Sequence, residues 1–227
     1  IRRYGTSELF TGDTTTALSV FKGLVNKDPD GSCNLMNLVG RLMFSAKKYD
    51  EALFFFNKRL ETNACNDSTD SKVYYLKGLS YLFLENRDSA ITSLQKSYSL
   101  DSLDASPIVY IGDAYAGMEN NAKAIEYFER AIELTLAHPE ENANNMRNAS
   151  AKLSGLYFKD KNWSKLLKTA KKWATNEPDD EYAALYTAIA YQGSGDIPNA
   201  CIWYGKVLKI NPNNKNAKQN KDALGCN

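Results

Sequence analysis

A pair of amphipathic segments joined by a short polar connection recurs along the chain about every 34 residues. Residues 105–134 give the clearest copy. Ile111 and Tyr115 in the first half, and Ala124 and Phe128 in the second, lie four residues apart, which is typical of amphipathic helices. Because so few residues join the halves, the two helices must lie antiparallel. Such a hairpin cannot bury its apolar face alone, so the sequence predicts a stack of hairpins.

The same residue types return at this interval on both sides of that copy. A small residue recurs in the first helix, and an alanine followed four residues later by a bulky residue recurs in most second helices. The successive small residues are Gly5, Gly40, Gly78, Gly112, Ser154 and Ala188. The pattern resembles the tetratricopeptide repeat (TPR), a helix–turn–helix unit, in six copies over nearly the whole chain. The resemblance implies an all-α fold, a right-handed α-solenoid of about six TPR repeats plus a C-terminal capping helix.

The spacing of the copies predicts the domain organisation. We expect one solenoid domain over residues 1–227, with repeats at about 1–31, 32–66, 70–103, 104–138, 139–179 and 180–213 and a cap at 213–226. The first predicted helix is Arg3–Phe10. The interval lengthens before the fifth repeat, where Pro139 suits a first helical position, so we expect an extended helix starting near Glu140. The fifth repeat diverges most, with Ala170 in the aromatic position and Trp173 in a position usually held by alanine.

Composition and motifs exclude several classes of function. The chain has 28 basic and 27 acidic residues, a balance that argues against general nucleic-acid binding. No apolar run reaches the length of a membrane span. His138 is the single histidine and lies beside a proline in a predicted turn, and no cysteine–histidine cluster has metal spacing. We therefore expect no enzyme activity, no metal and no cofactor from this segment.

The resemblance implies a binding surface. In the family, the first helix of each hairpin lines a concave groove that holds an extended peptide or a partner's helix. By resemblance the groove residues here are Asn37, Arg41, Tyr75, Leu79, Val109, Asp113, Lys152, Phe158 and Ile189. The family's best-known groove grips a peptide carboxylate with paired lysine, asparagine and arginine side chains. Tyr75 and Leu79 occupy one of those pairs here, so this clamp is absent, and a mixed groove favours apolar anchors with a few polar contacts. The alternative is that these residues pack against adjacent hairpins or a neighbouring molecule.

Two functions follow from the repeats. The first is a scaffold or adaptor that binds a protein or peptide partner in the groove. The alternative is a structural or self-associating segment of a larger protein or assembly, for example a homo-oligomer. The lysines of the fifth repeat, such as Lys168 and Lys172, fit a solvated outer helix face better than an anion-binding patch.

The hairpin geometry restricts how the four cysteines can pair. Cys33 begins the first helix of the second repeat and Cys65 follows its second helix, so both lie at one end of that hairpin. Cys201 lies near the start of a helix and Cys226 ends the antiparallel cap, so these two also meet. The predicted pairs Cys33–Cys65 and Cys201–Cys226 favour an oxidising, periplasmic or secreted setting. The alternative is four reduced thiols and a cytoplasmic protein.

Overall fold

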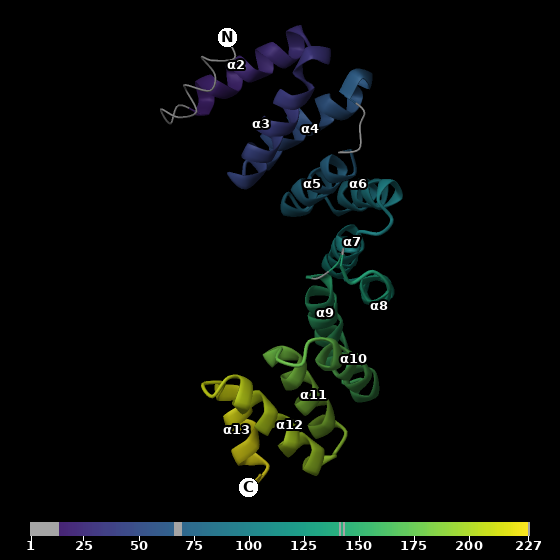
Figure 1. Ribbon diagram of the computed structural model, residues 1–227, viewed down its shortest axis with the longest axis vertical. Helices are drawn as coiled ribbons and strands as arrows, with labels where there is room; N and C mark the ends of the chain where they lie inside the picture. The colour runs from purple at the N-terminus through teal and green to yellow at the C-terminus, as the bar shows by residue number, and fades with distance from the viewer. Residues whose placement is uncertain (1–13, 66–69, 141, 143, 227) are drawn as a thin grey trace. The chain divides into compact units, whose positions relative to one another are not determined.

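The computed structural model describes residues 14–65, 70–140, 142 and 144–226, and every regular element in these residues is a helix. Twelve α-helices follow one another there, joined by short turns (Figure 1). The prediction of an all-α fold built from helix–turn–helix repeats is therefore confirmed. The predicted first helix, Arg3–Phe10, lies outside the described residues.

The chain divides into two compact units, residues 1–118 and 119–227. The first contains α2 (Thr14–Lys27), η1 (Asp30–Ser32), α3 (Cys33–Ser45), α4 (Tyr49–Glu61), η2 (Asn63–Cys65), α5 (Asp70–Phe83), α6 (Arg87–Leu100) and α7 (Ser106–Gly117). The second contains α8 (Asn121–Ala137), α9 (Asn145–Lys159), α10 (Trp163–Asn176), α11 (Glu181–Gly193), α12 (Ile197–Ile210) and α13 (Lys215–Ala223). That the repeats form a single domain stays a prediction.

Hairpin turns within both units share one backbone geometry, seen clearly between α5 and α6. The N–H of Glu85, whose φ is positive, donates to the Leu82 carbonyl at 3.0 Å, and the Asn86 N–H donates to the Tyr81 carbonyl at 2.9 Å. This pair of bonds is a Schellman motif, which ends the first helix. The Asn86 side chain then accepts the Ser89 N–H at 3.2 Å and caps the next helix. The equivalent positive-φ residues are Lys47, Lys161 and Gly195.

In three hairpins, α3–α4, α5–α6 and α11–α12, the small residue of the first helix lies against the second helix, as the sequence predicts. A Cβ on Gly40 would lie 2.6 Å from the Phe56 ring, and a Cβ on Gly78 would lie 2.6 Å from Leu94 Cγ. In the second unit, Ala188 is fully buried in one cluster with side chains of α12. These contacts fix how closely the two backbones of a hairpin approach.

The connection between α8 and α9 differs from the sequence prediction. The first helix of the fifth repeat begins at Asn145 rather than near Glu140, and α8 instead extends to Ala137. The side chain of Asn142 donates to the His138 carbonyl at 2.9 Å. Asparagine side chains offer backbone groups an alternative to helical hydrogen bonds. Pro139 and Glu140 accordingly lie in a turn rather than in a helix.

The divergent fifth hairpin still buries a large aromatic residue. Trp173 and Ala170, both on α10, are fully buried. The Trp173 indole N–H donates to the Glu177 carboxylate at 3.2 Å, so its polar atom is satisfied.

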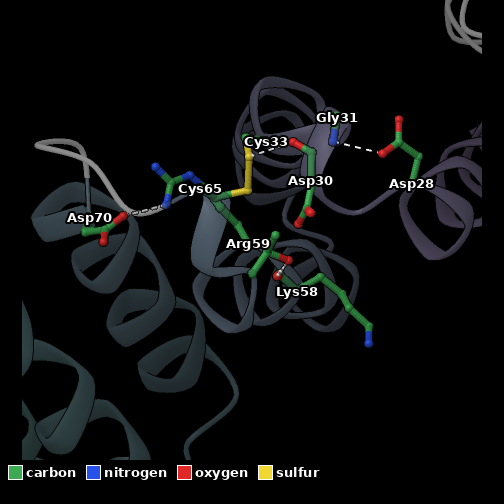
Figure 2. Close-up of a disulfide and its surroundings, with 9 residues drawn as sticks. Asp28, Asp30, Gly31, Cys33, Lys58, Arg59, Cys65 and Asp70 are labelled. Atoms are coloured by element: carbon green, nitrogen blue, oxygen red, sulfur yellow. Dashed lines mark hydrogen bonds and ion pairs between the residues drawn. A yellow bond between two sulfur atoms is a disulfide. The ribbon is translucent and has the colours of Figure 1, made fainter.

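Two disulfides close loops in the structure, between the same cysteines that the sequence pairs. Cys33 and Cys65 have Cα atoms 5.2 Å apart and join the start of α3 to η2, as Figure 2 shows. Cys201 and Cys226 have Cα atoms 5.5 Å apart and tie α12 to the residues after α13. Each bridge thus adds a covalent link between two segments that are distant in the sequence.

A buried ion pair lies beside the first disulfide. The Nη1 atom of Arg59, on α4, lies 2.5 Å from the Oδ1 atom of Asp70, at the start of α5 (Figure 2). The Arg59 side chain is 2% exposed and the Asp70 side chain is 17% exposed. A buried guanidinium needs a partner because its desolvation is costly. This pair therefore fixes how the second hairpin meets the third.

Replacing Gly78 with alanine should lower the free energy of unfolding by about 1–3 kcal/mol, because the new Cβ overlaps Leu94. The matched control is Gly23→Ala in α2, where nothing lies within 4 Å of the added Cβ. That change should stabilise by about 0.5–1 kcal/mol through helix propensity. Urea unfolding followed by circular dichroism measures both, and equal effects would contradict the close approach.

Replacing Asp70 with asparagine should lower the free energy of unfolding by about 3 kcal/mol, because it leaves the Arg59 charge buried without its carboxylate. Glu61→Gln is the control, since Glu61 pairs with Lys58 at 3.7 Å on the exposed surface. It should change stability by less than about 1 kcal/mol. Chemical denaturation gives both values, and similar losses would show that burial is not what matters.

Candidate functional site

A cavity of about 590 Å³ lies on the first helices of the first unit. It is lined by three predicted groove residues, Asn37 and Arg41 of α3 and Tyr75 of α5. Both pairs of neighbouring first helices in this unit, α3 with α5 and α5 with α7, are in direct contact. The remaining lining residues are Phe44, Ser45, Lys72, Leu76 and Asp104.

Tyr75 is the most perturbed group in this cavity. Burial raises its pKa well above the usual range, and the neighbouring Tyr110 and Asp104 raise it further. The rings of Tyr75 and Tyr110 meet edge to face with centroids 5.8 Å apart. The Tyr75 phenol therefore keeps its proton at physiological pH, and its hydroxyl already hydrogen-bonds with Tyr110. The hydroxyl oxygen can still accept a hydrogen bond from a ligand.

Aromatic side chains support the other wall of the cavity. The Phe44 ring lies 5.7 Å from the Tyr49 ring and 6.0 Å from the Phe83 ring, and Tyr49 stacks on Phe83 at 4.7 Å. Arg41 and Lys72 are exposed at the cavity while Tyr75 and Leu76 are half-buried. The site therefore combines an apolar floor with exposed cations, and Asp104 is the one acidic group among its lining residues.

Three other predicted groove residues of this unit lie elsewhere. Leu79 and Val109 have exposed fractions of 7% and 2%, so they pack in the interior instead of facing a ligand. Leu79 directly follows Gly78 on α5, whereas Val109 lies three residues before Gly112 on α7. Asp113 of α7 is half-buried and does not line this cavity.

The second unit holds two cavities that α9 and α11 both line. One, of about 380 Å³, contains the predicted Lys152 together with Arg147 and Tyr182. The Arg147 guanidinium lies over the Tyr182 ring at 5.7 Å, and its Nε atom contacts the Asp180 carboxylate at 3.0 Å. Asn148, Ala151, Trp173 and Tyr186 complete this cavity. We call it the cationic cavity.

The other cavity, of about 450 Å³, contains the predicted Phe158 and Ile189. Phe158 meets Trp163 edge to face at 6.0 Å. The Tyr204 hydroxyl donates to the Gln192 side-chain oxygen, and burial raises the Tyr204 pKa to about 12. Trp163, Tyr204, Gln192, Gly193 and Asn220 complete the lining. We call it the aromatic cavity.

Sequence reasoning missed several lining residues, for two different reasons. Lys72 lies three residues before the predicted Tyr75, and Arg147 lies four residues before Ala151, the neighbour of the predicted Lys152. Helical spacing could therefore have identified both. Asp104 comes from the connection before α7, and Asn220 comes from the capping helix α13. Their positions depend on how elements pack, which spacing alone does not give.

Comparison with known families decides what these hairpins are. The family model described as tetratricopeptide repeat matches residues 71–102 and 110–138. The chain contains tetratricopeptide repeats. The first match covers nearly all of α5 and α6, and the second covers most of α7 and all of α8. Repeats of this kind build extended surfaces for protein–protein interaction.

Solved structures with the same fold include other TPR proteins. MamA is 22% identical with a TM-score of 0.62, covering 79% of this chain and 91% of its own. YrrB, described as a TPR protein with an unusual peptide-binding site, is 19% identical with a TM-score of 0.63, covering 89% and 97%. The C-terminal part of a TPR repeat-containing protein from Cytophaga hutchinsonii is 20% identical with a TM-score of 0.69, covering 92% and 79%. At these identities the likeness shows the fold alone.

No curated protein sequence matches this chain. Across the described residues, none of the helices combines the length and the apolar character that a membrane crossing requires. The same part of the chain has no group of three or more histidine, cysteine or acidic side chains placed to hold a metal ion.

Proposed function

We propose that this TPR protein is a non-enzymatic scaffold that binds a protein or peptide partner along the first helices of its hairpins. The observation that carries the proposal is the cavity of the first unit. Asn37, Arg41 and Tyr75 belong to two different repeats, yet they line one cavity of about 590 Å³. A ligand there would touch two hairpins at once, as an extended peptide in a TPR groove does.

The chemistry of this cavity suits a peptide with an apolar anchor. Tyr75, Leu76 and Phe44 offer apolar surface for one large side chain, and aromatic residues often supply much of the binding energy in such contacts. Asn37 and the Tyr75 hydroxyl can hydrogen-bond to the peptide backbone. YrrB, whose fold this chain shares, is described as having a peptide-binding site, and this supports the same use of the fold here.

We also propose that the protein works in an oxidising setting, the periplasm or outside the cell. The support is that both cysteine pairs lie close enough to bond, with Cα atoms 5.2 Å and 5.5 Å apart. Disulfides persist in such compartments and are rare in a reducing cytoplasm. The alternative setting, the cytoplasm, requires all four thiols to be reduced.

Replacing Tyr75 with alanine should weaken peptide binding by about 2 kcal/mol, or roughly 30-fold, because an aromatic anchor surface is lost. The peptides come from a random displayed library selected on the 227-residue chain, and their affinities are measured by fluorescence anisotropy. Tyr75→Phe keeps the ring and should lose much less. The control Lys168→Ala, on the outer helix α10, should leave affinity unchanged.

Two results would count against the groove as the binding surface. One is a larger effect from Lys168→Ala than from Tyr75→Ala in variants with unchanged circular dichroism. The other is a library selection that yields no binder while sedimentation shows a stable oligomer. The second result would favour the self-associating alternative.

Protein isolated from its natural compartment, with thiols blocked at lysis, should show no titratable thiol after denaturation without reductant. Reduction should then lower the free energy of unfolding by about 3 kcal/mol for each bridge, because each closes a loop of some tens of residues. Four titratable thiols would remove the argument for an oxidising compartment and favour the cytoplasm.

A further inference from the structure

We infer that α9 and α11 of the second unit form a bipartite groove for an extended peptide, with an acidic residue at one end and a large apolar residue at the other. This inference rests on the proposed function and adds to it a second site and a ligand class. It starts from the two cavities that these helices share, which differ in chemistry.

The cationic cavity is built to hold a carboxylate. Its lining includes Arg147 and Lys152 and no acidic residue. Among the described residues, the Asp180 carboxylate contacts the Nε atom of Arg147, and the two terminal amino groups of the guanidinium can then donate to a ligand. Asp180 also accepts the N–H groups of Tyr182 and Ala183, which fixes the carboxylate that orients Arg147. An arginine oriented in this way can bind a carboxylate through two parallel N–H···O hydrogen bonds.

The aromatic cavity is built to hold an apolar side chain. Phe158 is 47% exposed and Trp163 is half-buried against it. The Trp163 ring lies directly on Gly193, where any side chain would displace it. Ile189 adds apolar surface, while the Gln192 and Asn220 amides can meet a peptide backbone. Exposed aromatic surface of this kind is typical of a binding anchor.

Gly155 connects the two cavities. It lies on α9 between Ala151 of the cationic cavity and Phe158 of the aromatic cavity, and it carries no side chain. A Cβ added there would meet only the Tyr186 hydroxyl, at 4.0 Å. The surface between the cavities is therefore open to a peptide backbone. A larger side chain at this position would obstruct it.

The helix geometry sets the spacing of the two anchors in the peptide. Ala151 and Phe158 are separated by about 10 Å along the axis of α9, at a rise of about 1.5 Å per residue. An extended peptide advances about 3.3 Å per residue, so about three residues cover that distance. The ligand class is thus a peptide with glutamate or aspartate about three positions from phenylalanine or leucine.

The test uses fluorescent nonapeptides with one glutamate and one phenylalanine in a serine–threonine background, spaced one, three or six positions apart and in both orders. Their binding to the 227-residue chain is measured by anisotropy. In at least one order, the spacing of three should bind about tenfold or more tightly than the others, since one extra charge-assisted contact is worth at least that factor. Gly155→Leu and Arg147→Ala should each reduce it to the level of the others.

Gly155→Ala is the matched control and should bind as the unsubstituted chain does, because a methyl group at this position leaves the groove open. Equal binding at all spacings, absence of binding, or full binding to Gly155→Leu would overturn the inference. If library peptides bind and depend on Tyr75 but not on Gly155 or Arg147, the proposed function stands and the bipartite groove is wrong.

Discussion

The close approach of the two helices in each hairpin is the constraint on which the rest of the structure depends. Gly40 and Gly78 leave no room for a Cβ against the facing helix, and Ala188 is fully buried at the equivalent position. Interiors pack at crystal-like density, so this spacing cannot relax without opening a cavity or moving a backbone. The distance between the two helices of such a hairpin is therefore fixed, and so are the faces that the hairpin presents to its neighbours.

Links other than apolar packing occur at two places in the stack: the connection between α4 and α5, and the C-terminal capping helix. Near the connection between the second and third hairpins, the Cys33–Cys65 bridge holds η2 to the start of α3. The Arg59–Asp70 ion pair links α4 to α5 at the same place. The capping helix α13 is short and polar, and Cys226 ties the residues after it to α12. In α13 the only buried residue is Ala217, so the Cys201–Cys226 bridge adds a covalent link where apolar burial is small.

The same rigidity makes the candidate binding surfaces. In the first unit, the first helices present Tyr75 and Arg41 on one cavity, and in the second unit they present separate cationic and aromatic cavities. The residues that line these cavities lie on described helices and in one short connection, so a ligand would lose little affinity to reorganisation of them. If both units bind ligands as proposed, differences in side chains between repeats, rather than differences in backbone, would decide what each unit binds.

The sequence by itself determined the repeat, the all-α fold, the hairpin turns and the cysteine partners. Each of these follows from local spacing, because a 3.6-residue period and a short connection leave one compact arrangement. Only the tertiary structure decided which of the predicted groove residues line a cavity. Leu79 and Tyr75 lie four residues apart on α5, yet one is buried by neighbouring helices and the other lines a cavity. The lining of a cavity includes side chains from other elements, such as Asp104 and Asn220, and no spacing within one helix encodes those.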